Sequence, residues 1–428
     1  MIAENGSEKL AVNRKQGRSR AGHWRFSRER FRVFCDIIFA ISVLRFDQNM
    51  SPPAARPQHE LAGEVRPPSP TQVLGMVLVS YVVFLVFLSC IGSSYWPMVE
   101  FKTGDNPAYL EVASAIRHWQ FSGLNVKQFW GLPYAVACVS VMSGASLPAA
   151  LVAVCVGASL VSVALCYWLF DGWIAAFFAL LSFEWLQRSL LGGAEPLFVA
   201  LLLGSFLTLR REHWVYAAVL GSLATVVRPF GVFALVGLGV QLLYRKRFRD
   251  CAIATSIALV IGALYAWPLK HYLGNPLANV ALYQKNDWHG GLPFNLPFVT
   301  IVHDTFPINA PLTNLALTLG WILFVLVGIA VAIRSGEFQH YAKNHTAEAC
   351  FVLLYCLALY TYDAPGWSRS NFPRFAIPVL PWILVFLKRY LPTNRKVLWA
   401  LAVIAPCLAA ASAVGIRQTW GILLQHFH

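Results

Sequence analysis

Four charged residues stand beside or between apolar stretches, where a charge is costly unless it has a partner or a function. They are Asp105 in TGDNPAYLE, Glu195 in GGAEPLF, Arg228 in TVVRPFG and Arg374 in NFPRFAIPVLP. A carboxylate in such a place is able to take a proton from an acceptor hydroxyl or amine. A guanidinium offers a bidentate fork that suits phosphate. The residue types therefore indicate acid–base chemistry next to a phosphate group.

Each of these residues also has a structural interpretation. Asp105 directly precedes an expected helix, where an aspartate serves as an ordinary N-cap. Glu195 has the alternative of a helix-start acid in the headgroup layer. Arg228 has the alternative of an ion pair with an acid such as Glu195. Arg374 has the alternative of an interfacial side chain that extends its charge to water. Both interpretations stay open at each position.

Further polar residues fall near these four in the expected loops. Arg369 shares a span mouth with Arg374, so two cations there suit a phosphate. Glu111 is a second carboxylate in the segment PAYLEVASAIRHWQF. Asp287 and His289 belong to a loop rich in aromatic residues, Asn and Gly, residue types that contact sugars, and we expect this loop to act as a substrate-side lid.

Metal and nucleic-acid chemistry find no support in the motifs. The nine cysteines include no CxxC pair and no zinc spacing, and most lie inside apolar runs as small buried hydrophobes. We therefore assign no metal ligand, and a divalent cation stays an open alternative that no ligand motif supports. The net charge of +14 is concentrated in the N-terminal arm and short loops, which indicates membrane orientation and lipid headgroup contact, and nucleic-acid binding is not expected.

The composition predicts a membrane protein. Of 428 residues, 57% are hydrophobic and 13% are charged, whereas a soluble domain carries about 25% charged residues. The first expected span covers 73–93, and the Lys and Arg residues before it place its N-terminal end in the cytoplasm. Further apolar stretches cover about 132–144, 148–170, 173–187, 195–209, 214–228, 229–244, 251–269, 312–333, 347–361, 375–388 and 397–412.

These stretches predict an all-α polytopic membrane protein with a bundle of about 10–12 transmembrane helices. The region 132–209 does not give a consistent topology. It starts outside and ends inside, but it contains four apolar pieces, and four crossings would return the chain to the side on which it started. One piece must be re-entrant or merged with another.

The domain organisation follows from the same pattern. The expected parts are a basic, disordered cytoplasmic arm at 1–72, a transmembrane domain at 73–412 and a C-terminal tail at 413–428. The expected outer loops cover about 95–131, 270–310 and 362–374. The first loop contains an amphipathic helix that lies along the membrane surface. Large loops on one face favour an enzyme that works at the outer surface of a bacterial inner or plasma membrane.

With these residues in place, the order of the motifs resembles the GT-C superfamily of membrane glycosyltransferases. GDNPAYLE follows the first span, GGAEPLF precedes a helix, TVVRPFG lies between two helices and NFPRFAIPVLP stands near the end. The superfamily uses polyprenyl-phosphate sugars and includes protein mannosyltransferases and aminoarabinose transferases. The resemblance covers about residues 73–412 and implies transfer of the sugar, with inversion, to a lipid, glycan or protein acceptor.

The resemblance also implies roles for single residues. Asp105 matches the acidic residue of the first outer loop, which serves as catalytic base or positions the acceptor. Arg374, in its RFxxPxxP context, is similar to the arginine that binds the donor phosphate, and Arg228 is a second such residue. Glu195 matches a structural or substrate-positioning acid. We expect Glu111, Asp287 and His289 to position the substrate as well. Family members often carry two adjacent acids in the first loop, whereas Asn106 follows here, which puts a metal-bridging scheme in doubt.

Two other classes of protein share part of this pattern. An outer-face glycan polymerase or ligase would use the same arginines with a diphosphate-linked donor. A membrane transporter would favour inverted repeats, and no such internal repeat is present in the sequence.

Overall fold

The fold is known from a computed structural model that describes residues 66–102, 105–121, 123–124, 127–286, 288, 292–305, 312–363 and 371–415. The chain divides into two units, Met1–Arg56 and Pro57–His428, and every described residue belongs to the second. Within the described ranges the protein is all-helical and has no strand, which confirms the predicted all-α membrane fold. The predicted arm as far as residue 65 and the tail beyond residue 415 lie outside the described residues.

Among the described residues, four helices are long and apolar enough to cross a membrane. They are α2 (Pro70–Cys90), α6 (Leu147–Leu169), α12 (Phe248–Leu273) and α21 (Arg395–Val414). Helices of 20–26 residues extend about 30–39 Å, enough for a hydrocarbon core of roughly 30 Å. Two bent pairs raise the number to six if each is one span: α7 (Gly172–Leu181) with α8 (Phe183–Leu191), and α15 (Leu312–Arg334) with α16 (Glu337–Asn344).

The other apolar stretches form shorter helices. They are α5 (Gly131–Ser143), α9 (Glu195–Arg210), α10 (Trp214–Val227), η2 (Pro229–Gly231) with α11 (Val232–Tyr244), α17 (Thr346–Thr361), and α19 (Phe372–Ala376), η3 (Ile377–Val379) and α20 (Leu380–Phe386) in succession. The remaining elements are α3 (Tyr95–Pro97), η1 (Met98–Lys102), α4 (Asn106–His118), α13 (Ala278–Asn286), α14 (Val299–Thr305) and η4 (Lys388–Tyr390). Length alone therefore yields four to six spans where we expected ten to twelve, because helices of 13–16 residues extend only about 20–24 Å.

Polar residues at the helix starts set several of these boundaries. Ser69 and Gln72 form a capping box at the start of α2. Asp171 accepts hydrogen bonds from two backbone N–H groups at the start of α7. Ser182 ends α7, and its hydroxyl accepts from the backbone N–H of Trp185 in α8. The apolar stretch therefore breaks at this serine, and the two helices meet at 75°.

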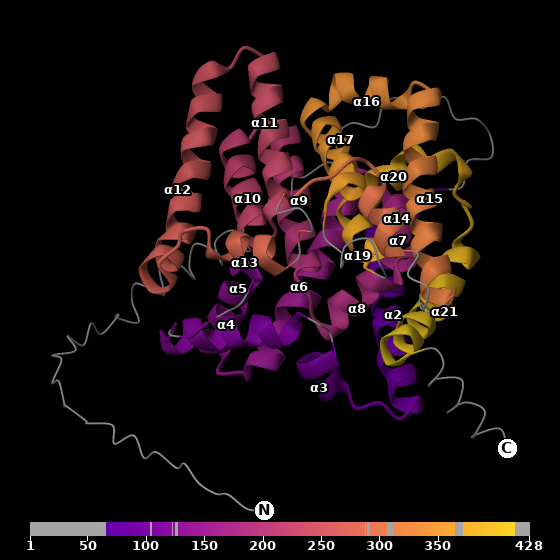
Figure 1. Cartoon of the computed structure of the whole chain (residues 1–428). Coiled ribbons are helices and arrows are strands. Elements are labelled where there is room, and N and C mark those ends of the chain that lie inside the picture. The colour runs from indigo at the N-terminus through magenta and orange to yellow at the C-terminus, as the bar shows by residue number, and fades with distance from the viewer. Residues whose placement is uncertain are drawn as a thin grey trace, which may run out of the picture. The chain divides into compact units, whose positions relative to one another are not determined.

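The helices run between two ends of the bundle, with α3 and α4 at one and α16 and the α11–α12 turn at the other (Figure 1). We call the end that carries Asp105 and Glu195 the site end. The opposite end is marked by the ion pairs Arg210–Glu348, Arg245–Glu212 and Lys388–Asp171. Helix α9 connects the ends, because it begins at Glu195 and finishes at Arg210.

Contacts at the two ends resolve the course of the chain between α5 and α9. Helix α5 stays at the site end, where Ser140 accepts a hydrogen bond from Arg117 of α4 (3.0 Å). Helix α6 crosses to the opposite end, where the carbonyl of Leu169 accepts from Arg210 (2.5 Å). Helices α7 and α8 return as one broken span, since the first residue of α4 donates to the carbonyl of Leu191 (2.7 Å). The piece that does not cross is therefore α5.

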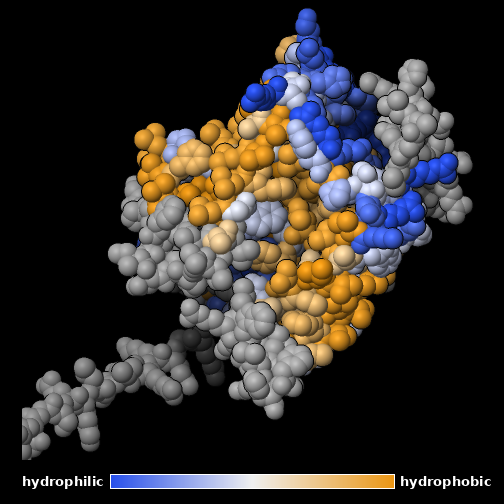
Figure 2. All heavy atoms as spheres, turned by 90° about the vertical axis from the view of Figure 1, so that its right-hand side faces the viewer, coloured by the Kyte–Doolittle hydropathy of each residue, from blue (hydrophilic) through white to orange (hydrophobic). Residues whose placement is uncertain are grey.

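Exposed apolar side chains indicate which surfaces face lipid. Leu74, Leu78, Val82 and Val86 repeat every four residues along α2 and are 44–60% exposed, while the other face of this helix packs on α21 and α7. A helix that is apolar on its buried and exposed sides alike is stable only next to lipid. Figure 2 shows the side of the molecule on which α15 and α21 lie, where apolar surface predominates and hydrophilic residues gather towards the top.

The segments that we expected as outer loops contact one another at the site end. Asn279 of α13 donates to the carbonyl of Gln128 (2.9 Å), and its side-chain oxygen accepts from Tyr265 of α12 (3.0 Å). Farther along, the backbone N–H of Asp363 donates to the carbonyl of Pro293 (2.9 Å). These contacts join the region after α4 to α13, and the region before α14 to the end of α17.

Candidate functional site

Asp105 is the residue directly before α4, but its side chain does not cap that helix. Its Oδ2 accepts a hydrogen bond from Arg374 Nη2 (2.6 Å), and its Oδ1 accepts from Gln128 Nε2 (3.1 Å). The alternative of an ordinary N-cap is therefore wrong for this residue. The carboxylate faces a buried cation instead of its own helix.

Glu195 is the first residue of α9, and its side chain is 1% exposed. Its Oε1 accepts hydrogen bonds from Arg374 Nε and from Arg228 Nη2. A helix N-terminus also favours a negative charge. The other oxygen, Oε2, is buried and has no hydrogen-bond partner in the described part of the chain. Gly193 makes room for it, because a Cβ there would lie only 2.6 Å from this oxygen.

Arg228 lies where the chain turns from α10 into η2. Its backbone is extended (φ −145°, ψ 132°), and Pro229 follows. Gly231 allows the tight turn, because a Cβ at this position would lie 2.5 Å from the backbone nitrogen of Thr225. The guanidinium pairs with Glu195, as the structural alternative predicted.

Arg374 joins the two carboxylates. It lies in α19 and its side chain is 7% exposed, so it is not an interfacial arginine that extends to water. Its Nε donates a hydrogen bond to Glu195, and its Nη2 donates one to Asp105. The ring of Phe375 lies beneath both guanidinium groups, 5.6 Å from that of Arg374 and 5.3 Å from that of Arg228.

Three more residues near this network escaped the sequence analysis. Arg188 of α8 pairs with Glu184 (3.2 Å) and passes beside Gly193. Gln128 holds Asp105, and Tyr109 is buried one turn into α4. The signal for Arg188 was present, since an acid and an arginine at i and i+4 in FEWLQRSLL form a helical ion pair inside an apolar stretch.

Charge in this network is balanced. Asp105 and Glu195 contribute two negative charges, and Arg228 and Arg374 contribute two positive ones. A phosphate would therefore share an arginine with one of these carboxylates or replace the carboxylate. Asp105 is the accessible member, with 29% of its side chain exposed.

The partners of Asp105 determine its acidity. Burial by itself would raise its pKa, but the charge of Arg374 and the hydrogen bonds from Arg374 and Gln128 outweigh burial and hold the pKa well below its usual range. The carboxylate is therefore ionised at neutral pH, and in this pairing it is a weak proton acceptor.

Asn106, which stands in place of a second acid, has a structural role. The residue is fully buried, and its Nδ2 donates to the carbonyls of Val99 and Leu191, both at 2.7 Å. These contacts tie the start of α4 to η1 and to the end of α8. A carboxylate at this position would face two carbonyl oxygens without a proton to donate.

Replacing Asn106 by aspartate is therefore expected to destabilise the protein by about 1–3 kcal/mol, because two buried acceptors lose their donor. Thermal unfolding in detergent measures the effect, and Asn344→Asp at an exposed position of α16 is the matched control. An unchanged melting temperature of Asn106→Asp would contradict the assigned amide orientation.

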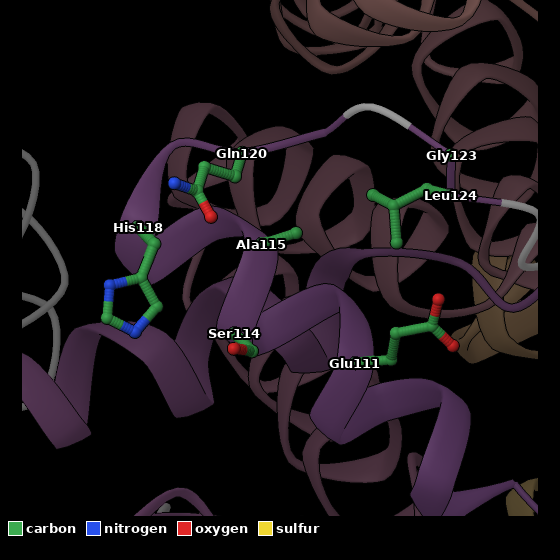
Figure 3. A pocket seen from close by; sticks show the side chains of 7 residues that line it. All are labelled: Glu111, Ser114, Ala115, His118, Gln120, Gly123 and Leu124. Carbon is green, nitrogen blue, oxygen red and sulfur yellow. The ribbon is translucent and has the colours of Figure 1, made fainter.

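The other predicted site residues do not join the network. Glu111 lies on the exposed face of α4. There it lines a cavity of about 320 Å³ with Ser114, His118, Gln120 and Leu124 (Figure 3). Arg369, Asp287 and His289 lie outside the described residues. In the ranges that the structure describes, no three His, Cys, Asp or Glu side chains lie close enough together to hold a metal ion.

Comparison with known protein families, curated proteins and solved structures found no match. What these observations establish is an all-helical protein with four to six candidate membrane spans. The charged network and the motifs that supply it are therefore the features that bear on function.

Proposed function

We propose that the protein is a membrane glycosyltransferase of the GT-C type, which moves a sugar from a polyprenyl-phosphate donor to a lipid, glycan or protein acceptor. The observation that carries this proposal is the buried network of Asp105, Glu195, Arg228 and Arg374. It combines a partly exposed carboxylate with arginines, the two kinds of group that glycosyl transfer from a phosphate donor requires. The order of the four motifs along the chain supports the same assignment.

The chemistry is a single displacement. An acceptor hydroxyl or amine attacks the anomeric carbon, and its proton passes to Asp105. The bond between the anomeric carbon and the phosphate oxygen breaks, and its electron pair leaves with the polyprenyl phosphate, so the configuration inverts. The negative charge on the phosphate increases from about −1 to −2 during this step. Arg374 and Arg228 therefore stabilise the transition state more than the bound donor.

Membrane orientation follows from the positions of the basic residues. Arg245 and Lys388 belong to clusters at the opposite end of the bundle from the network. By the positive-inside rule, that end faces the cytoplasm. The proposed site then lies at the outer face of a plasma or bacterial inner membrane, at the start of α4. A lipid donor reaches it from the outer leaflet.

The test is a donor assay on the purified full-length chain. Wild-type protein and Asp105→Ala would be mixed with a panel of polyprenyl-phosphate sugars and a crude lipid and glycan extract as acceptor. We expect wild type to release polyprenyl phosphate. Asp105→Ala should release it at least about 100-fold more slowly, because a positioned base usually contributes a factor of this size.

Glu212→Gln is the control for this assay, because this carboxylate is exposed and lies at the opposite end of the bundle. It should retain the wild-type rate. Full activity of folded Asp105→Ala would refute the role of Asp105. Failure of wild type with every monophosphate donor would refute the proposal and direct the search to diphosphate-linked donors and then to transport.

A further inference from the structure

We propose that Asp105 is a phosphate-gated base: Arg374 holds it until the phosphate of the donor takes over the Nη2 group of this arginine, and Gln128 then keeps the released carboxylate in place. The inference rests on the proposed function, because it adds a regulatory step to the same site. It assigns a positioning role to Gln128, which the motifs did not suggest.

Arg374 is shared unequally between its two carboxylates. Glu195 is 1% exposed and accepts hydrogen bonds from both Arg374 and Arg228. An incoming anion that replaced it would leave a buried carboxylate without a partner, which is costly. Asp105 is 29% exposed and accepts a hydrogen bond from only one nitrogen of Arg374. The Asp105–Arg374 contact is therefore the pair that a phosphate opens.

Gln128 holds Asp105 independently of Arg374. Its Nε2 donates to Asp105 Oδ1, whereas the arginine contacts Oδ2. The backbone of Gln128 is itself fixed, because its carbonyl accepts from Asn279 of α13 (2.9 Å). Asn279 is 1% exposed and also accepts from Tyr265 of α12. A chain of contacts thus connects α12 and α13 to the carboxylate, which keeps one fixed partner after the arginine turns to the phosphate.

This exchange changes what Asp105 does chemically. The groups that act on it are Arg374 from α19, Arg188 from α8, Gln128 after α4 and Tyr109 within α4. Paired with Arg374, the carboxylate is too weakly basic to activate a nucleophile. When the arginine turns to a phosphate, Asp105 loses its closest cation and gains a nearby anion, and both changes raise its pKa. The base thus becomes effective only with donor in place, which protects the donor from premature attack by water.

Binding of dodecyl phosphate, a mimic of the released polyprenyl phosphate, tests the competition directly. The affinity of the full-length chain in a non-ionic detergent would be measured at neutral pH by calorimetry. Because Asp105 and the probe compete for Arg374, Asp105→Asn should bind the probe about tenfold tighter than wild type. Glu100→Gln, which removes a charge elsewhere at the site end, should bind it like wild type.

The outcomes separate the gate from the proposed function. If Asp105→Asn binds no tighter than wild type while Arg374→Gln abolishes binding, the gate is refuted and the phosphate site stands. If neither wild type nor any variant binds the probe, the gate and the proposed phosphate site both fail.

A second measurement uses only wild-type protein and so does not depend on the folding of a variant. A water-soluble carbodiimide labels protonated carboxyl groups, and peptide mass spectrometry quantifies the label on Asp105. The depressed pKa should keep this residue unlabelled in mildly acidic buffer, and dodecyl phosphate should increase its labelling several-fold. Labelling that does not change with the probe, relative to Glu111 on the outer face of the same helix, would refute the gate.

Discussion

Replacement of Arg374 by leucine is expected to abolish sugar transfer and to lower the free energy of unfolding by about 3–5 kcal/mol. Among the residues that the structure describes, Arg374 is the one that bonds both Asp105 and Glu195. Its loss leaves Asp105 without its cation, and the buried Glu195 keeps only Arg228. In a donor assay the leaving phosphate would also lack the charge that stabilises it. Thermal unfolding in detergent should show a decrease of roughly 10 °C.

A double variant separates the two effects of this change. Arg374→Leu combined with Asp105→Asn removes one charge of each sign and leaves the Glu195–Arg228 pair intact. We expect this protein to regain much of the lost stability but no activity. Arg211→Leu, at an exposed position just beyond α9, is the matched control and should change neither property. A single Arg374→Leu variant with wild-type stability would contradict the network of Asp105, Arg374 and Glu195.

The second large effect is expected at the opposite end of the bundle. Glu348 of α17 is 2% exposed and accepts from Arg210 Nε (2.6 Å) and Nη2 (2.8 Å), from Tyr341 (2.5 Å) and from Trp382 (2.9 Å). These donors come from α9, α16 and α20, so one carboxylate joins four helices. Replacement by glutamine should cost about 3–5 kcal/mol of stability, because it leaves Arg210 partly buried without its counter-charge.

Activity and stability should separate at this position. Glu348 lies at the far end of α9 from the proposed chemistry, so the fraction of Glu348→Gln that remains folded at low temperature should keep the wild-type affinity for dodecyl phosphate. Glu212→Gln is the matched control, because its ion pairs are exposed and worth about 1 kcal/mol or less. Equal melting temperatures for the two variants would show that the Glu348 cluster does not hold α16 and α20 to the bundle.

Much of the fold was predictable because lipid imposes a strong constraint on the sequence. A chain in a bilayer must satisfy its backbone within helices, so long apolar runs predict helices directly. The expected span at 73–93 corresponds to α2 (Pro70–Cys90), and 397–412 falls within α21 (Arg395–Val414). The break inside 173–187 was not predictable, because it depends on a single serine that ends one helix and caps the next.

What the sequence by itself determined is the membrane character of the protein, the helices and the four charged positions of the network. Composition and apolar run length are local properties, and a costly charge among apolar residues is visible without a structure. Only the tertiary structure decided which charges meet. Arg374 is 269 residues from Asp105 and 179 from Glu195 along the chain, and no local pattern encodes contacts at such separations. The shared arginine arises because α4, α9, η2 and α19 begin close together at one end, where their charged side chains pair with one another.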